Sequence, residues 1–136
     1  MFTFKGKLKA SPNDIYNTLL EQMILDIEDK TQKKIKVSQL EKGFKYKYKK
    51  KNNYITVEVL KTIPNKKITT IYNQGENRWE LTYEIDAIDK EWSRLLYIQN
   101  DGLEEIKGIK SLLSNMELNK RFNKLEAHIK STLSNA

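Results

Sequence analysis

Two acidic side chains occupy positions where a strand would present them together. Glu84 and Asp86 are two residues apart in an alternating segment, so they share one strand face, opposite Tyr83 and Ile85. A hydrolase could use such a carboxylate pair, and a hard metal ion could bind to it. No clear third ligand and no histidine accompanies the pair, so we expect solubilising acids that face outward, and we predict no metal site.

The remaining candidates for catalysis are sparse. General acid–base catalysis favours a group that titrates near neutrality, and His128 is the only histidine. It lies beside the apolar stripe of its predicted helix, near Lys124 and Arg121, so we expect an exposed surface residue. The chain has no cysteine and neither of the glycine-rich phosphate motifs, GxxxxGK[ST] and GxGxxG. We therefore predict no catalytic residues and no cofactor, and a binding module rather than an enzyme.

The positive charge of the chain is concentrated in one region. The formal net charge is +7, and residues 30–51 contain ten lysines and one acid, Glu41. That region carries +9, which leaves −2 for all other residues. Lysine lacks the planar fork with which arginine grips phosphates and base edges. A solvated lysine face is the simplest interpretation, and an acidic protein partner for that face is the functional alternative.

Aromatic and basic residues alternate inside this region, a composition that also suggests nucleic-acid binding. In a strand, however, the two kinds face opposite sides, whereas a base-stacking platform needs both on one accessible surface. We therefore expect no specific nucleic-acid binding, while attraction to polyanions through lysine alone stays open. The aromatic residues are Phe44, Tyr46 and Tyr48, and the predicted basic face consists of Lys45, Lys47, Lys49 and Lys50.

The N-terminal part predicts a strand followed by a helix. Residues 2–10 alternate between apolar and polar side chains, which is typical of a half-buried strand. The tetrapeptide at 11–14 offers a serine cap, a proline for the first turn and an acid three residues after the serine. Apolar residues then recur every four positions, which predicts an amphipathic helix to about Asp29. A short second helix is expected around residues 37–40.

The rest of the chain predicts five more strands and a long final helix. Turn-forming residues separate the strands, and residues 73–77 read as a loop. The inward face of the last strand stays unassigned. An apolar stripe then predicts a helix over about 103–133 with a break near Ser114. The five strands are expected at residues 44–49, 55–59, 68–72, 78–85 and 92–99.

These elements fit one α+β domain that spans residues 1–136, a length that can bury a sizeable core. The N-terminus shows no basic stretch followed by an apolar run, so we expect no secretory signal. The longest apolar runs fall far short of the roughly 20 residues that span a bilayer, so we expect no integral membrane protein. We expect a cytoplasmic protein, either a monomer or a homodimer.

The junction of the first strand and helix resembles that of the START-like, or SRPBCC, superfamily, which has the helix-grip fold of the birch pollen allergen. The resemblance rests on the sequence ASPNDIYNTL at 10–19, with a small residue, Ser-Pro, an acid or amide, and then an aromatic residue. The segments YITVEVLKTIPNKKITTIY and RWELTYEIDAIDKEWSRLLY also resemble the bacterial family called domain of unknown function 3284. This resemblance implies a bent antiparallel sheet that wraps around a long C-terminal helix.

In that superfamily, the space between sheet and helix commonly binds apolar or amphipathic small molecules, including lipids. Other members are cyclases or hydrolases, or bind protein partners such as a chaperone. The resemblance therefore implies an apolar or amphipathic ligand for this chain, although the same side chains could simply fill a core. Our candidates for the cavity lining are Phe44, Tyr46, Tyr48, Val57, Val59, Trp79, Leu81, Tyr83, Phe122 and Leu125.

Overall fold

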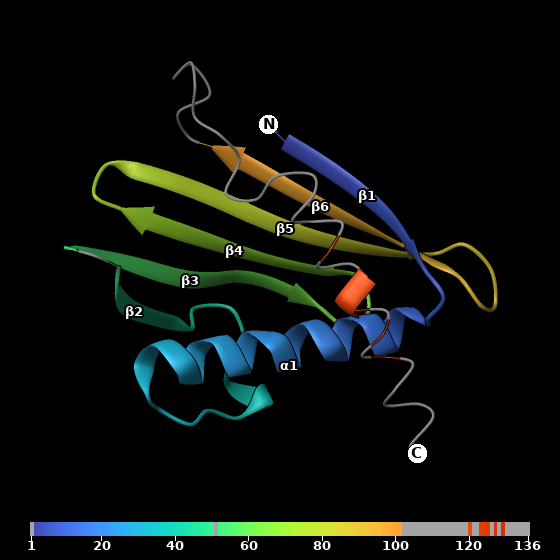
Figure 1. Ribbon diagram of the computed structural model, residues 1–136, viewed down its shortest axis with the longest axis horizontal. Helices are drawn as coiled ribbons and strands as arrows, with labels where there is room; N and C mark the ends of the chain where they lie inside the picture. The colour runs from blue at the N-terminus through green and yellow to red at the C-terminus, as the bar shows by residue number, and fades with distance from the viewer. Residues whose placement is uncertain are drawn as a thin grey trace.

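The computed structural model, which describes residues 2–50, 52–101, 120, 123–125, 127 and 129, consists of a curved antiparallel sheet crossed on one face by a long helix (Figure 1). The helices are α1 (Pro12–Thr31) and the short 3₁₀ helix η1 (Val37–Gln39). The strands are β1 (Phe2–Leu8), β2 (Lys45–Lys50), β3 (Asn53–Ile63), β4 (Lys67–Gln74), β5 (Asn77–Ala87) and β6 (Ser93–Asp101). This architecture confirms the predicted α+β class.

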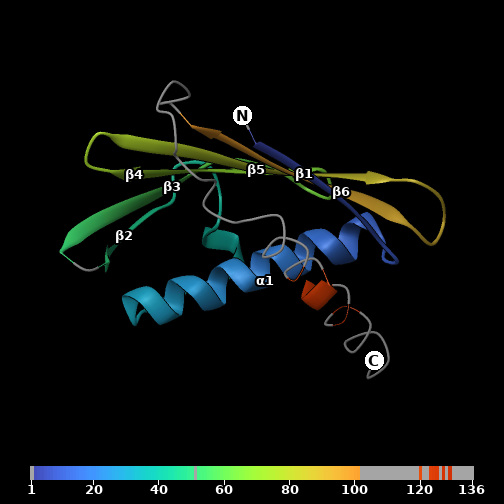
Figure 2. The same ribbon diagram turned by 45° about the horizontal axis from the view of Figure 1, so that its top comes forward.

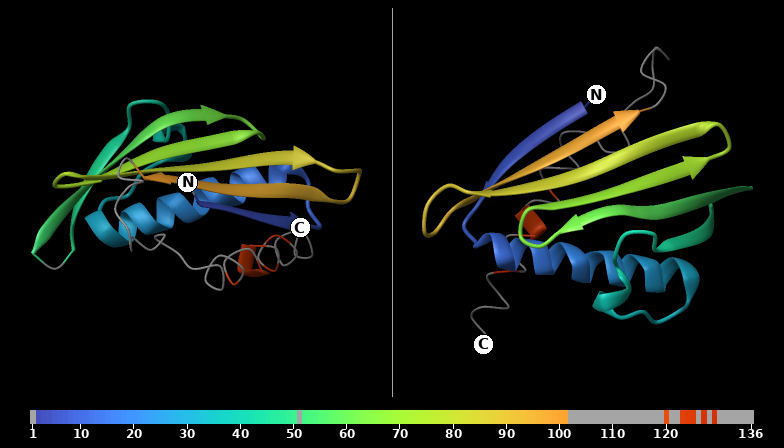
Figure 3. Two further views of the ribbon diagram at one scale, coloured as in Figure 1. Left: turned by 90° about the horizontal axis from the view of Figure 1, so that it is seen from above. Right: turned by 180° about the vertical axis from the view of Figure 1, so that it is seen from behind.

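The strands lie in the order β1-β6-β5-β4-β3-β2, and every neighbouring pair is antiparallel. The N-terminal strand β1 and strand β2 therefore form the two edges. Figures 2 and 3 show α1 running below the sheet on one side, which we call the inner face. The pairing of β3 with β4 shifts register between Val59 and Lys61, a bulge that adds local twist.

Helix α1 begins and ends as its sequence predicts. The Ser11 hydroxyl oxygen accepts a hydrogen bond from the Asp14 backbone N–H at 3.1 Å, and Pro12 occupies the first turn. At the other end, Gln32 adopts a left-handed conformation (φ 59°) and its N–H donates to the Glu28 carbonyl. The helix extends two residues beyond the predicted end at Asp29.

The structure corrects the loop predicted at residues 73–77. Strand β4 continues to Gln74 and β5 begins at Asn77, so only Gly75 and Glu76 form the turn. Asn73 pairs with Arg78, and Gln74 with Asn77. Gly75 has a φ of +59°, a conformation that glycine adopts at little cost. The polar residues that suggested a loop therefore form the last paired positions of a tight hairpin.

Two predicted helices have different outcomes. The short helix expected at 37–40 is present as the single 3₁₀ turn η1. Most of the helix predicted over 103–133 lies outside the described residues. Within the described part, residues 120, 123–125, 127 and 129 are helical, and Leu125 and Ile129 are buried in the core.

The core lies between α1 and the inner face of the sheet. The apolar stripe of α1 packs against apolar residues of the strands. These strand residues lie on one face of the sheet, because directly paired residues in an antiparallel sheet point to the same side. On β6, whose inward face was unassigned, the buried residues are Ser93, Leu95, Tyr97 and Gln99. The buried cluster comprises Leu8, Ala10, Ile15, Tyr16, Leu19, Leu20, Ile27, Leu40, Ile68, Ile85, Leu95, Tyr97, Leu125 and Ile129.

One buried hydrogen bond links the first strand–helix junction to the start of β6. The Ser93 hydroxyl donates to the Ala10 carbonyl oxygen at 2.7 Å. We expect Ser93→Ala to lower the free energy of unfolding by roughly 1–3 kcal/mol, since a buried carbonyl loses its donor. Urea denaturation measures this change. Ser38→Ala, at an exposed serine, is the matched control, and equal stability of the two variants would contradict the assignment.

Candidate functional site

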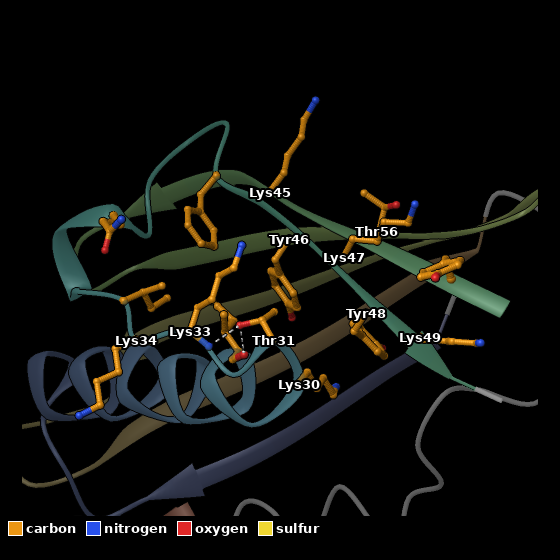
Figure 4. Close-up of a pocket in the computed structure, with 15 residues that line it drawn as sticks. Lys30, Thr31, Lys33, Lys34, Lys45, Tyr46, Lys47, Tyr48, Lys49 and Thr56 are labelled. Atoms are coloured by element: carbon orange, nitrogen blue, oxygen red, sulfur yellow. Dashed lines mark hydrogen bonds between the residues drawn. The ribbon is translucent and has the colours of Figure 1, made fainter. Parts of the chain in front are cut away.

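Strand β2 presents its aromatic and basic residues to opposite sides of the sheet. Tyr46 pairs with Val57, and Tyr48 with Ile55, so both tyrosines share the inner face with buried residues of β3. Lys45, Lys47 and Lys49 are exposed. Figure 4 shows Tyr46 and Tyr48 pointing toward α1 while Lys45 points away from it. The alternation predicted from the sequence therefore places the tyrosine rings on the inner face of this edge strand and these three lysines on its outer face.

A pocket of about 790 Å³ opens at this edge, where the end of α1 and the loop after it face β2 (Figure 4). The helix and loop contribute Ile27, Lys30, Thr31, Lys33, Lys34, Ile35 and Gln39 to its lining. The sheet contributes Phe44, Lys45, Tyr46, Lys47, Tyr48, Lys49, Tyr54 and Thr56. The lining extends around both sides of β2, with Phe44, Tyr46 and Tyr48 on the inner face and Tyr54 on the outer face.

Aromatic rings form a continuous surface along the inner side of β2. The rings of Tyr46 and Tyr48 are stacked, with centroids 6.1 Å apart and an interplanar angle of 22°. Phe44 follows at 6.3 Å from Tyr46, tilted by 42°. Ile27 and Ile35 add aliphatic surface from the opposite wall. This surface suits a flat or apolar body, because such contacts bury area without demanding directed hydrogen bonds.

Lys30 connects the last turn of α1 to this aromatic surface. Its ammonium lies 3.1 Å from the Asp26 carboxylate, one helical turn earlier. The same ammonium lies 4.3 Å from the centroid of the Tyr48 ring, within the range of a cation–π contact. Lys30 is therefore already engaged by a carboxylate and a ring.

Two phenols near Asp26 are held in the neutral form. Burial raises the pKa of Tyr46 well above its ordinary value, and the neighbouring Tyr72 and Asp26 raise it further. Burial, followed by the charge of Asp26, raises the pKa of Tyr72 to about 12. Both hydroxyls thus stay protonated in neutral solution and can donate a hydrogen bond.

The structure divides the predicted cavity residues into several groups. Phe44, Tyr46 and Tyr48 line the pocket, whereas Val57 and Val59 are buried, each with 1% of its surface exposed. The register places Trp79, Leu81 and Tyr83 on the same inner face, where they are half-buried and lie outside this pocket. Leu125 belongs to the core cluster, and Phe122 lies outside the described residues.

Three residues of the predicted basic face, Lys45, Lys47 and Lys49, lie on the other side of β2. Lys45 makes an ion pair with Glu58 at 3.6 Å, and the Lys47 ammonium lies 4.3 Å from the Tyr54 ring centroid. Lys49 is exposed, and Lys50 is the last residue of the strand, paired with Asn53.

Sequence reasoning missed the pocket residues on α1 and in the loop. It assigned all lysines of 30–51 to a solvated face, whereas Lys30 and Lys33 belong to the wall opposite the tyrosines. A signal existed for Lys30, which follows Ile27 by three residues and so lies on the apolar side of the helix. Lys33 lies beyond the helix end, where no periodicity applies.

The acidic pair considered for catalysis lies on the outer face of β5. Glu84 pairs with Lys67 across the sheet, with an ammonium–carboxylate distance of 3.4 Å, and Asp86 is exposed opposite Arg94. The described residues contain no group of three acidic, histidine or cysteine side chains placed to hold a metal ion. His128, the other candidate, lies outside the described residues.

In this chain a first strand and a capped helix precede the remaining strands of a curved antiparallel sheet. This order of elements is typical of the START-like, or SRPBCC, class of folds. The chain belongs to the family described as domain of unknown function (DUF3284), which it matches over residues 2–119. No curated protein matches it. Among the described residues, no helix combines the length and apolarity that crossing a membrane requires.

Solved structures of low sequence identity share the fold. Protein MLL2253 from Mesorhizobium loti is 17% identical with a TM-score of 0.60, over 96% of this chain and 98% of that protein. The Aha1 dimer from Colwellia psychrerythraea is 17% identical with a TM-score of 0.52, over 98% and 96% of the two chains. DynU16, from the dynemicin biosynthetic locus, is 6% identical with a TM-score of 0.62. That match covers 96% of this chain, which spans about half, 47%, of DynU16.

The raised pKa of Tyr72 makes a prediction for alkaline solution. The folded value of about 12 exceeds the unfolded value near 10, so the stabilisation by the neutral phenol is complete below pH 10 and is lost as the pH rises through 12. We expect the wild-type free energy of unfolding to fall by roughly 2 kcal/mol more than that of Tyr72→Phe over this interval. Denaturation curves at several pH values measure the difference.

Phe44→Leu provides the control, because it alters packing beside the tyrosines without removing a titrating group. It should keep the wild-type dependence on pH. A Tyr72→Phe protein that loses stability as steeply as the wild type would show that the phenol is not held neutral by the fold.

Proposed function

We propose that this chain is a non-enzymatic small-molecule-binding module that receives an apolar or amphipathic ligand on the inner face of its sheet. The observation that carries the proposal is the pocket of about 790 Å³ lined by Phe44, Tyr46 and Tyr48. Ligand pockets typically combine an apolar or aromatic lining with a few polar groups that fix orientation. Here the ring surface is the apolar part, and the hydroxyl groups of Tyr48 and Thr31 and the lysine ammonium groups of the lining are the polar part.

We propose that a longer ligand continues from the pocket along the inner face. Trp79, Leu81 and Tyr83 share that face and are half-buried, so they offer further apolar surface. In this proposal the predicted helix over 103–133 covers the opposite side of the ligand and contributes Phe122. The buried side chains of Leu125 and Ile129 support this, because they place part of that segment against the core.

Binding rather than catalysis is favoured by the positions of the acidic residues. The carboxylates considered for a hydrolase, Glu84 and Asp86, lie on the outer face, across the sheet from the tyrosines. Lys67 already forms an ion pair with Glu84.

We further propose a cytoplasmic protein that is a monomer or a homodimer, and the dimeric Aha1 neighbour supports the homodimer.

A neutral fluorescent probe tests the binding of an apolar body. N-phenyl-1-naphthylamine gains emission when it leaves water for an apolar site. We expect saturable binding that Tyr48→Ala weakens by about fivefold, since an aromatic contact contributes on the order of 1 kcal/mol. Trp92→Ala is the matched control, because Trp92 is an exposed aromatic residue between β5 and β6 that lies outside the pocket lining. Circular dichroism checks that both variants are folded.

Absence of saturable binding to the wild type would overturn the proposed function. An equal effect of Tyr48→Ala and Trp92→Ala would show that the probe binds elsewhere. Mass spectrometry of material released on denaturing freshly purified protein provides an independent readout, and a lipid or aromatic metabolite near one equivalent is the expected result.

The exposed outer side of β2 supports a second candidate, a protein-interaction module. Lys45, Lys47 and Lys49 are exposed on the side of the strand opposite Tyr46 and Tyr48, a geometry suited to an acidic partner. We expect Lys47→Glu combined with Lys49→Glu to abolish binding to poly-glutamate at low salt, while binding of the neutral probe stays at the wild-type level. Surface plasmon resonance and the probe titration measure the two effects. If the double variant loses probe binding as well, the two faces do not act independently.

A further inference from the structure

The pocket has a strongly one-sided charge. Six of its fifteen lining residues are lysines, and none is acidic. The lysines come from two parts of the chain, Lys30, Lys33 and Lys34 from the helix end and loop, and Lys45, Lys47 and Lys49 from β2. A cleft with charge of one sign raises the local concentration of the opposite charge. The lining therefore favours an anion over a neutral molecule of the same shape.

Only some of these lysines have a carboxylate or an aromatic ring as a neighbouring partner. Lys30 is paired with Asp26, and Lys45 with Glu58. Lys47 lies over the ring of Tyr54 on the outer side. With Lys47, whose contact is a ring, four lysine charges of the lining are thus left without a carboxylate among the described residues.

Lys33 is the one unpaired lysine that points into the inner part of the pocket. Figure 4 shows its side chain extending from the loop toward β2, on the side of Tyr46, whereas Lys34 points away from the strand. The loop conformation that directs Lys33 is fixed locally, because the Lys33 backbone N–H donates to the Thr31 hydroxyl and that hydroxyl donates to the Ile27 carbonyl. The cation therefore faces the aromatic surface from a position anchored to the end of α1.

The charge of Asp26 makes the surroundings of Tyr46 and Tyr72 unfavourable for an anion. This carboxylate lies close enough to Tyr46 and Tyr72 to raise the pKa of both phenols. An acid group placed among these phenols would meet the Asp26 carboxylate, whose charge Lys30 offsets only in part, whereas an acid group at the loop would meet Lys33, which has no ion pair among the described residues. The polar end of a ligand is consequently favoured at the loop, with its apolar body against the rings.

We propose that the ligand of this pocket is an amphipathic organic acid, with its carboxylate, sulfonate or phosphate held at Lys33 and its flat or apolar body against Tyr46 and Tyr48. This inference rests on the proposed function, since it assigns the ligand class of the same pocket. The acid group forms an ion pair with the Lys33 ammonium at the rim, and the rings bury the body beside it.

Two probes that share an anilinonaphthalene skeleton test the charge separately from the apolar contact. We expect 8-anilinonaphthalene-1-sulfonate to bind about fivefold more tightly than the neutral N-phenyl-1-naphthylamine, as expected for one exposed ion pair. Lys33→Gln should remove most of that preference and leave the affinity for the neutral probe unchanged. Lys36→Gln is the matched control, since Lys36 is an exposed lysine in the same loop outside the pocket lining. Added salt should reduce the preference in the wild type and in Lys36→Gln.

The outcomes distinguish a failure of the anion assignment from a failure of the proposed function. Equal affinities of the wild type for both probes would overturn the anion assignment while the neutral probe still supports a binding module. Equal losses in Lys33→Gln and Lys36→Gln would also overturn it, because general surface charge would then explain the preference. If neither probe binds, the proposed function and this inference both fail.

Discussion

Burial of the apolar stripe of α1 against the inner face of the sheet is the interaction on which the other features depend. Ile15 and Ile27 are almost completely buried and join Ile85 and Leu95 in one cluster. Each such side chain contributes roughly 1.5–3 kcal/mol relative to its exposed state. Because Ile27 is held in the core, Lys30 must emerge one turn later beside β2. The position of the pocket is thus a consequence of where the apolar stripe ends.

The alternation of β2 separates two kinds of chemistry across one strand. Successive side chains of a strand point to opposite faces, so a single edge can hold rings toward the helix and ammonium groups toward solvent. A register slip of one residue would exchange the two sets and bury lysines. The ion pair of Lys45 with Glu58 and the stacked pair of Tyr46 and Tyr48 both favour the observed register. The site is therefore fixed by the same pairing that fixes the sheet.

Most of the fold could be predicted from the sequence because its elements follow simple periods. The strand at residues 2–8 and the capped helix at 12–31 match the predicted pattern closely. Strand β6 was harder, since Leu95 and Leu96 are both apolar and give no alternation. The pairing with β5 decides it, placing Leu95 opposite Ile85 and burying it. Such information comes from a neighbouring strand and is not contained in the segment itself.

The candidate site was predictable only in part, for a related physical reason. A strand pattern identifies Tyr46 and Tyr48 as sharing a face, but it does not distinguish a ring that lines a pocket from a valine that is fully buried. Val57 shares that face and is 1% exposed. The difference arises from position in the sheet, because among the described strands β3 has a neighbour on each side whereas β2 has only β3. Edge position, which depends on the whole topology, turns an apolar stripe into an accessible surface.

The edge position also explains which lysines need a functional interpretation. An exposed edge strand risks pairing with another chain, and lysines along it oppose such association. Lys45, Lys47 and Lys49 are adequately explained in this way, as charges that keep β2 from pairing further. Lys33 is not on the strand and does not protect its edge. Its side chain points toward β2 from the opposite wall of the pocket, without an ion pair among the described residues. The general requirement to protect an edge therefore accounts for the outer lysines and leaves Lys33 as the residue whose placement is best explained by an anionic ligand.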